Sequence, residues 1–490
     1  MEVVMIIMVL FLLGLVWNLL RSVNGFVYER LKLGNQRFLL PPGDLGLPFF
    51  GNMLSFLRAF KSTNPDSFIS SFVTRFGRTG IYKAFMFGNP SIIVTAPDTC
   101  KRVLTDDDCF KPGWPKSTVT LIGKKSFIGI GQEEHKRLRR LTSSPINGHE
   151  ALSLYLEFID EKVVLALDKW SKMGQIELLT QLRKLTFRII MHIFLSTESD
   201  QVMEALEKEY TVLNHGVRAM AINIPGFAYH KAFKARKNLV NVFQSVVSER
   251  RRRMGTMNLS GRTKGDMLDS LLHVEDDKGR RLTDEEIIDI LVMYLNAGHE
   301  SSGHTAMWAV LYLHKHPEVF QKAKAEQEAI LRKRPAGQRG LTLKEFRQME
   351  YISKVIDETL RIVSFSLMVF REAITDVKIN GYIIPKGWKV LVWFKSVHFD
   401  SDTYPNPTEF DPSRWDGFTP RMGSFLPFGA GTRLCPGNDL AKLEIAVFLH
   451  HYLLGYEFDR ENPDSRIMNL PHPRPKDNCL GKIKKVSQHL

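Results

Sequence analysis

The longest apolar run of the chain lies at its N-terminal end. Residues 3–20 are apolar except for Asn18, and as a helix rising 1.5 Å per residue they would extend about 27 Å, close to the thickness of a bilayer core. A cleaved signal peptide is the competing interpretation, but Glu2 stands where such a peptide would carry a positive charge, and no clear small-x-small cleavage site follows. We therefore expect residues 1–22 to form an uncleaved transmembrane anchor.

Positive charge follows this apolar run instead of preceding it. By the positive-inside rule, such residues keep the part of the chain that follows them in the cytosol. Residues 23–48 are expected to be a basic and proline-rich hinge. No Ser/Gly/Pro-rich linker divides the remainder, so residues 49–490 should form one large domain. The basic residues concerned are Arg21, Arg30, Lys32 and Arg37.

Apolar positions with a helical period of 3.6 residues dominate this domain. A capping box, Thr283-Asp284-Glu285-Glu286, begins a further long helix, which should end where Pro317 follows His316. The body is therefore expected to be mainly α-helical. The other segments with a clear helical period are 151–170, 176–196, 235–253 and 343–362.

Strand patterns are confined to a short part of the chain. Segments 377–379 and 382–384 flank an Asn-Gly turn, and segment 388–394 follows a Pro-Lys-Gly turn, so all three look like strands of hairpins. Together with the helical segments, they predict a fold that is mainly α with a small β part.

Composition and charge exclude some classes of protein. Only four cysteines occur, with neither metal-ligand spacing nor the density of a disulfide-stapled secreted fold, which favours a reducing compartment. A net charge of +14 suits nucleic acid, an anionic membrane or an acidic protein partner. The densest basic run, 250–253, looks like the solvated end of a helix and has no aromatic platform beside it, so we expect no nucleic-acid partner.

One of the cysteines lies in a glycine-rich loop at 428–437, two residues after Arg433. Glycines allow a positive φ and a close approach to a flat ligand, and inward-facing amides can hydrogen-bond a thiolate. An inert buried cysteine is the commoner explanation of a single cysteine. The surrounding pattern favours instead a Cys435 thiolate bound to haem iron, with Arg433 facing a haem propionate. The loop glycines are Gly429, Gly431 and Gly437.

From Phe428 to Gly437 the loop fills every fixed position of Phe-x-x-Gly-x-Arg-x-Cys-x-Gly, and so it resembles the haem-binding signature of the cytochrome P450 family. The resemblance implies the prism fold of that family and a haem b whose iron is bound by Cys435. It also implies that Phe428 and Gly437 help to bind the haem. A haem monooxygenase of this kind uses O2 and two electrons from NADPH, delivered by NADPH-cytochrome P450 reductase at the endoplasmic reticulum membrane.

The long helix after Thr283 contains a polar insertion at 296–303, where two glycines cost about 1 kcal/mol each relative to alanine. Gly298 would leave room for a ligand, and Glu300 beside Ser301 is an acid–alcohol pair suited to proton delivery. Local packing against another element is the alternative explanation. The insertion resembles the oxygen-activation motif of the family, with serine in place of the usual threonine. Ser302 or Thr305 would be substitutes for Ser301.

Three further motifs extend the resemblance. Glu358 and Arg361 lie on one helix face, and Arg414 lies in a Pro-x-x-Phe-x-Pro-x-Arg-Trp segment, so that the resemblance implies a structural Glu-Arg-Arg triad beneath the haem loop. Arg139 and Arg371 occupy positions that the family uses for the haem propionates. His135, where the family commonly has tryptophan, is either a further propionate donor or an ordinary surface or core residue.

At finer grain the chain resembles the ent-kaurenoic acid oxidase branch of the family, which acts in gibberellin biosynthesis. That branch oxidises a diterpene acid in three steps, by ring hydroxylation, ring contraction to an aldehyde, and oxidation to a carboxylic acid. A sister branch that oxidises β-amyrin-type triterpenes shares much of the pattern. Rivals of another class are a haem-thiolate isomerase or dehydratase and a non-catalytic haem sensor, neither of which needs an acid–alcohol pair. The segments that carry the resemblance are 41–46, 86–91, 110–115, 223–227 and 297–304.

Overall fold

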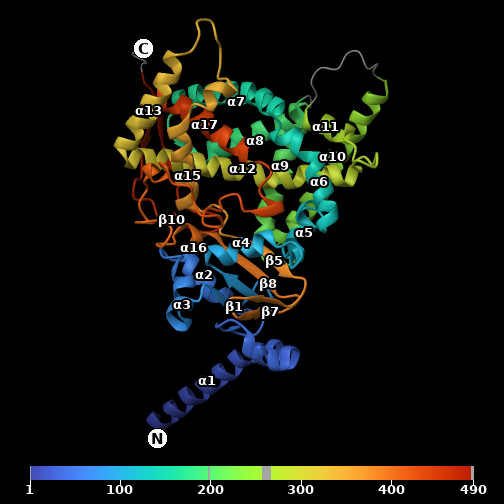
Figure 1. The fold of residues 1–490 in the computed structure, drawn as a ribbon, viewed down its shortest axis with the longest axis vertical. Helices are drawn as coiled ribbons and strands as arrows, with labels where there is room; N and C mark the ends of the chain where they lie inside the picture. Colours follow the sequence, from blue (N-terminus) through green and yellow to red (C-terminus); the bar gives the residue numbers. More distant parts are fainter. Residues whose placement is uncertain (1, 197–198, 257–265, 487–490) are drawn as a thin grey trace.

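The computed structural model of the protein describes all residues except 1, 197–198, 257–265 and 487–490. A helix-rich part holds most of the chain, and a smaller part built around a sheet lies at the end from which the N-terminal helix α1 projects (Figure 1). The predicted class, mainly α with a small β part, is confirmed.

The central element is α12, Asp284–Lys315, which packs against α8, Leu178–Leu195, and α17, Asn438–Gly455. The predicted capping box is present, because the Glu286 amide donates to the Thr283 hydroxyl and the Thr283 amide donates to the Glu286 carboxylate. The helix ends at His316, as expected, and α13, Pro317–Arg332, begins with the proline.

Three of the predicted helices are confirmed as α7, His149–Lys172, α8 and α10, Ala228–Thr256. The fourth, predicted over 343–362, is divided into α14, Leu343–Phe346, and α15, Glu350–Val363. A second capping box at Thr342 and Glu345 starts α14, and tight turns separate this short helix from α15.

The basic run at the end of α10 differs from expectation. Arg250 is buried, with 4% of its surface exposed, and donates hydrogen bonds to Asp266 and Asp269. This arginine therefore ties α10 to the chain beyond the undescribed segment, and the run is not simply a solvated helix end.

The main sheet has the strand order β1-β2-β8-β5-β3, with β2 and β8 parallel and the other pairs antiparallel. Segment 388–394 was expected to extend the 377–384 hairpin, but β8 pairs with β2 and β5 in the middle of the sheet. The reason is its run of apolar residues, which is buried on both faces as in a central strand. The strands are β1 Ile81–Met86, β2 Asn89–Val94, β3 Phe110–Pro112, β5 Met368–Ala373 and β8 Lys389–Trp393.

The two faces of this sheet carry separate apolar clusters, because successive side chains of a strand point to opposite faces. Val390 and Val392 pack with α4 residues on one face, whereas Leu391 packs with Phe370 and α2 residues on the other. The largest cluster lies among α7, α8, α12, α15 and α17. The core of the molecule is therefore helical, with the sheet as a second, smaller core.

The remaining elements are short or peripheral. The predicted hairpin of β6, Val377–Ile379, and β7, Tyr382–Ile384, is confirmed as a separate two-stranded sheet. The others are α2 Met53–Lys61, α3 Ser67–Phe76, α4 Pro97–Thr105, α5 Lys116–Ile122, α6 Gln132–Asn147, α9 Asp200–Val217, α11 Met267–His273, α16 Phe394–His398, β4 Ile176–Glu177, β9 Tyr456–Arg460, β10 Ile467–Met468, β11 Arg474–Pro475 and β12 Leu480–Lys485.

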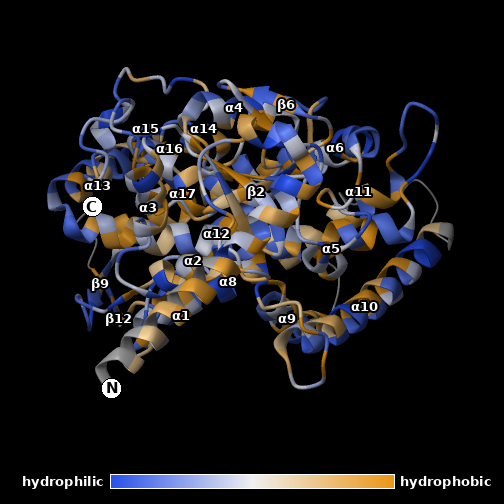
Figure 2. Ribbon diagram, turned by 90° about the horizontal axis from the view of Figure 1, so that it is seen from below, coloured by the Kyte–Doolittle hydropathy of each residue, from blue (hydrophilic) through white to orange (hydrophobic). Residues whose placement is uncertain are grey.

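The N-terminal helix α1, Glu2–Gly25, stands away from the body and is coloured mostly hydrophobic in Figure 2. Its end is attached to the body, because Asn24 donates to the Leu45 and Leu47 carbonyls and Lys83 forms an ion pair with Glu29. Within the described part of the chain, no helix combines the length and the apolar character needed to cross a membrane.

The predicted Glu-Arg-Arg triad is present, with Glu358 and Arg361 fully buried and Arg414 partly exposed. Both Glu358 oxygens accept from Arg361, at 2.7 and 2.8 Å, and one of them also accepts from Arg414 at 3.3 Å. Arg361 donates further to the carbonyls of His398, Pro407 and Glu409. The triad therefore fixes α15 to the irregular segment that leads into the 428–437 loop, as the expected structural role requires.

Replacing Glu358 should be costly, because it would leave a guanidinium that has no exposed surface without its counter-charge. We expect Glu358→Gln to lower the free energy of unfolding by about 3 kcal/mol or more, as when one partner of a buried ion pair is removed. Urea unfolding measures the change. Glu350→Gln, an exposed position on the same helix, is the control and should have little effect. Equal, small losses in both variants would contradict the role of the triad.

Candidate active site

The 428–437 loop makes two turns that require glycine. Gly429 and Gly431 have φ of +77° and +74°, and a Cβ on Gly431 would lie 2.6 Å from the Leu104 carbonyl oxygen. A side chain at Gly431 would therefore be both strained and obstructed. Gly437 differs from expectation, because its φ is −103° and it does not need the left-handed region.

Cys435 lies just before α17. Its amide donates to the Phe428 carbonyl at 2.9 Å, which closes the loop, and the Gly437 amide donates to its sulfur. Burial raises the pKa of the Cys435 thiol, while the Gly437 amide and Arg139 act in the opposite direction. A metal ion bound at the sulfur would favour the thiolate further.

Four basic residues from two elements, α6 and β5, and from the loop itself gather near this sulfur. Burial lowers the pKa of Arg433 to about 10, and the charge of Arg371 adds to the effect. Burial and the charges of Arg433, Arg139 and Arg371 lower the pKa of His135 to about 4. Among the described residues, only Asp107 is recorded as an acid that offsets these charges. The three arginines therefore carry more positive charge than Asp107 balances, and His135 beside them is neutral at pH 7.

Unused hydrogen-bond donors in this cluster also indicate a binding site for an anionic group. Arg433 donates to the Phe127 carbonyl and to Gln132, but its buried Nε has no partner in the described part of the chain. The buried Nδ1 of His135 likewise has none there. Two carboxylates of a bound group would satisfy both the charge and the donors. The predicted propionate residues therefore lie together, and they fit a haem.

One face of α12 also fits a flat group. Ala297 is exposed and Ser301 partly exposed, although most of α12 is buried. Tyr294, one turn earlier, lies within electrostatic range of both Cys435 and Arg139. The exposed strip of α12 is therefore close to the cysteine loop, as a haem between the two would require. The Ser301 hydroxyl donates to the Ala297 carbonyl at 3.0 Å.

The Glu300 carboxylate contacts residues other than the neighbouring Ser301, and the proton-delivery role of this acid–alcohol pair stays a prediction. One Glu300 oxygen accepts from Asn214 at 3.0 Å, and the carboxylate forms ion pairs with Arg218 and Arg183. Burial alone would raise the pKa of Glu300, but the two guanidiniums hold it well below its usual range. Glu300 is therefore an ionised carboxylate that connects α12 to α8 and to the end of α9.

Gly298 and Gly303 lie against α8. A Cβ on Gly298 would lie 3.2 Å from Cδ1 of Ile190, and one on Gly303 would lie 3.4 Å from the backbone of α8. Because an α-helix has 3.6 residues per turn, the two glycines lie on either side of the helix line that faces away from Ala297. They allow α8 and α12 to pack closely, so helix packing explains them better than room for a ligand.

Sequence analysis missed Glu444 of α17. It has 4% of its surface exposed, and no charged group pairs with it among the described residues; its one polar interaction there is a weak contact with the Ser302 hydroxyl. It lines a cavity of about 10 Å³ between α7, α8, α12 and α17, together with Ser302 and Thr186. Burial raises the pKa of Glu444 to about 8, so its carboxyl is mostly neutral at pH 7. The sequence carries a signal of this residue, because Glu444 is the only acid in the otherwise apolar stretch 443–449.

A neutral Glu444 predicts how stability depends on pH. Because the native state keeps the proton and the unfolded state loses it, stability falls as the pH rises from about 4.3, the usual pKa of glutamate, to about 8. Glu444→Gln has no such loss. Its stability relative to the parent chain should therefore increase with pH by up to about 1.4 kcal/mol per unit.

Thermal unfolding between pH 5 and pH 8, at about one-unit steps, measures this difference. Glu457→Gln, an exposed site on β9, is the control and should show no trend. A difference between Glu444→Gln and the parent chain that stays constant over the range would show that Glu444 is ionised in the native state.

Comparisons with known proteins agree with this geometry. The family model described as Cytochrome P450 matches residues 41–478. The chain is 66% identical to "Ent-kaurenoic acid oxidase 1" of Arabidopsis thaliana over 97% of each chain, and 49% identical to "Beta-amyrin 11-oxidase" of Glycyrrhiza uralensis over 95% of each. Among solved structures, the retinoic acid-bound cyanobacterial CYP120A1 superimposes with a TM-score of 0.79 at 27% identity, covering 91% of this chain and 99% of that one.

Proposed function

Since this chain belongs to the cytochrome P450 family and is a haem-dependent monooxygenase, we propose that its substrate is ent-kaurenoic acid. The observation that carries the proposal is 66% identity to an ent-kaurenoic acid oxidase over nearly the full length of both chains. Three successive steps are proposed, namely ring hydroxylation, ring contraction to an aldehyde, and oxidation to a carboxylic acid. The product would be a gibberellin precursor.

Different residues of the site would hold the iron and the propionates of the haem. Cys435 would bind the iron, and Arg433, Arg371, Arg139 and His135 would donate to the propionates. When bound, the haem would supply the activation of O2, which a thiolate ligand favours. The positive charge of the three arginines would also orient the haem, because it would attract the propionates to that side.

On α12 we propose separate roles for the two residues expected to act together. Ser301 lies on the exposed strip and is the hydroxyl placed to hold a proton beside the substrate. Glu300 is held as a carboxylate by Arg218 and Arg183, and it acts by positioning α12 against α9. Such a pairing leaves no proton on the acid to give.

We further propose that α1 attaches the protein to the endoplasmic reticulum membrane, with the body in the cytosol, and that NADPH-cytochrome P450 reductase is the electron donor. Large apolar side chains along α1 are exposed, which water disfavours. Basic residues follow the helix directly, which favours a cytosolic position for the body. The exposed apolar residues include Met5, Met8, Phe11, Leu12, Leu15 and Leu19.

Product identity tests the proposed substrate. Microsomes that contain the full chain and the reductase, supplied with NADPH, should convert ent-kaurenoic acid to products whose masses match the three steps. β-Amyrin should give no product. Oxidised β-amyrin with unchanged ent-kaurenoic acid would place the chain with the triterpene oxidases, and turnover without NADPH would favour an isomerase. Cys435→Ser is the control, because it should lose both activity and the carbon monoxide difference band of a thiolate haem.

Deletion of residues 1–22 should move the protein from the microsomal pellet to the supernatant, because it removes the exposed apolar helix. Quantitative blotting of both fractions measures the change. A haem spectrum equal to that of the full chain shows that the body remains folded. A folded variant that stays in the pellet would contradict α1 as the main attachment.

A further inference from the structure

His398 is the last residue of α16, and none of its surface is exposed. Both of its ring nitrogens have partners from distant parts of the chain. Nε2 lies 2.9 Å from the Leu426 amide, and Nδ1 lies 2.7 Å from the Ser364 hydroxyl. The ring therefore joins the end of α15 to the segment that leads into the 428–437 loop.

The partners of His398 determine which nitrogen carries the ring proton. A backbone amide can only donate, so Nε2 accepts from Leu426 and has no proton of its own. Burial and the charge of Arg361 lower the pKa of His398 to about 3, so the ring is neutral at pH 7 and keeps one proton. That proton lies on Nδ1 and is donated to Ser364, whose hydroxyl donates in turn to the Arg361 carbonyl at 2.9 Å. One tautomer therefore satisfies every group in this chain of hydrogen bonds.

Ser364 has a backbone conformation that serine rarely adopts. It caps α15 in the left-handed region, with φ +45° and ψ +58°, where glycine is the usual residue. A side chain is strained in that region. The hydroxyl compensates for the strain, because it connects the His398 ring to the helix. Strained positions of this kind are typical of residues that a function constrains.

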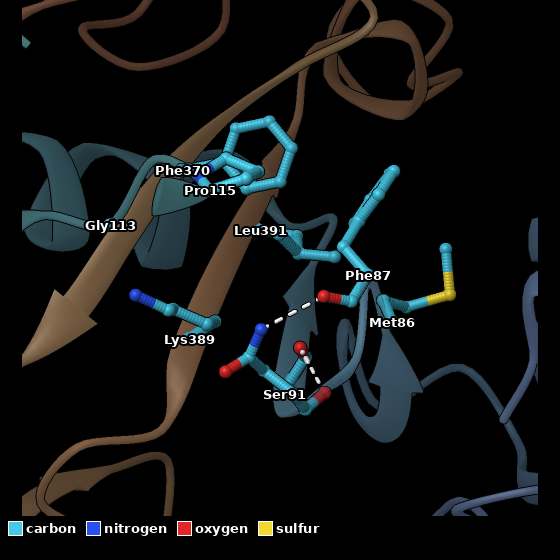
Figure 3. A pocket seen from close by; sticks show the side chains of 9 residues that line it. Met86, Phe87, Ser91, Gly113, Pro115, Phe370, Lys389 and Leu391 are labelled. Carbon is cyan, nitrogen blue, oxygen red and sulfur yellow. Dashed lines mark hydrogen bonds between the residues drawn. The ribbon is translucent and has the colours of Figure 1, made fainter. Parts of the chain in front are cut away.

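The main sheet supports His398 from the other side. Helix α16 follows β8 without an intervening loop, so the central strand of the sheet sets the position of His398. Figure 3 shows Leu391 of β8 beside Phe370 of β5 and near Phe87, and these side chains pack on one face of the sheet. A side chain held by a packed strand is placed more precisely than one on a loop.

The backbone of His398 is bound to the Glu-Arg-Arg triad as well. Its carbonyl accepts from Arg361 at 2.9 Å, and Arg361 is paired with Glu358. His398 thus meets Arg361 twice, directly through this carbonyl and indirectly through Ser364. Removal of the ring leaves the triad intact, so the role of the ring can be tested separately from that of the triad.

Leu426 connects the ring to the turn that places Cys435. Its carbonyl accepts from the Gly429 amide at 3.1 Å, and the Phe428 carbonyl accepts from the Cys435 amide at 2.9 Å. Leu426 has 1% of its surface exposed, so its amide would stay buried without a partner if the ring were lost. The His398 ring therefore holds the point at which the chain enters the cysteine loop.

We propose that His398 is a positioning residue for the thiolate ligand, because its Nδ1-protonated ring holds the Leu426 amide and thereby fixes the loop that presents Cys435 to the haem iron. Without this bond the loop has more than one arrangement, and the iron loses its thiolate more readily. The inference concerns the ligand of the iron, so it does not depend on the proposed substrate.

Two substitutions separate the two nitrogens of the ring. The side-chain amide of His398→Asn lies near the place of Nδ1 and can still donate to Ser364, but it does not reach Leu426. The longer side chain of His398→Gln brings its oxygen near the place of Nε2, where it can accept from the Leu426 amide. Both variants replace the ring by an amide, and they differ in the bond to the loop.

The measurement is the carbon monoxide difference spectrum of the full-length, haem-loaded enzyme, which reports how much haem keeps its thiolate. Spectra are taken in urea below the concentration at which helical circular dichroism begins to fall, so that global unfolding does not contribute. We expect His398→Asn to lower the ratio of thiolate to non-thiolate haem about tenfold, the value of one buried hydrogen bond. His398→Gln should keep most of the ratio.

Two further variants sharpen the result. Ser364→Gly removes the hydroxyl but relieves the left-handed strain, so the ratio should fall although the midpoint of urea unfolding changes little. His450→Asn is the control, because His450 has 1% of its surface exposed and lies towards the end of α17 that is far from Cys435, with Nδ1 2.8 Å from Gln327. It should lower the midpoint of urea unfolding and keep the ratio.

An equal fall of the ratio in His398→Asn and His398→Gln would overturn the proposal, since loss of the ring itself would then explain both. An unchanged ratio in His398→Asn, or a fall of the same size in His450→Asn, would overturn it as well. If His398→Asn binds no haem, Ser364→Gly decides, and a ratio equal to that of the parent chain would contradict the role of the ring. No substrate is present in these measurements, so failure of the enzyme to oxidise ent-kaurenoic acid would overturn the proposed function alone.

Discussion

The excess of positive charge on the arginines beside Cys435 is the constraint to which the rest of the site responds. Arg433 comes from the cysteine loop, Arg139 and His135 from α6, and Arg371 from β5, and separate parts of the fold hold them together. Guanidiniums that lose water on folding without a full counter-charge oppose folding. Binding of an anionic haem therefore contributes to the stability of the native state as well as to its chemistry, and the protein and its cofactor are expected to fold as one unit.

Two buried carboxyl groups lie near the polar insertion of α12, and their surroundings drive them to opposite charge states. Glu300 is ionised because Arg218 and Arg183 more than offset its burial. Glu444 is neutral because its cavity offers only hydroxyl groups and hydrocarbon. The residue type alone does not distinguish them, since both are glutamates in apolar helices. The charge state of each glutamate is therefore set by the neighbours that the tertiary structure places around it.

That difference explains how far the sequence could be interpreted. Features encoded by contiguous residues were predictable, and the Cys435 loop, the Thr283 capping box and the Glu358–Arg361 pair lie as expected. Features that depend on distant partners were not. Glu300 meets Arg218, 82 positions earlier in the chain, and no local pattern signals that contact. The break between α14 and α15 and the central place of β8 likewise depend on tertiary packing, because the local sequence is compatible with more than one arrangement.

The two glycines on the α8 side of α12 differ in what a larger residue would meet. A methyl group at Gly298 would lie 3.2 Å from Cδ1 of Ile190, so the end of that side chain would have to shift, whereas one at Gly303 would make ordinary van der Waals contact with the backbone of α8. Of these two positions, residue 298 is therefore the one at which the seam between the two helices is tight, and a single aliphatic side chain of α8 sets that limit.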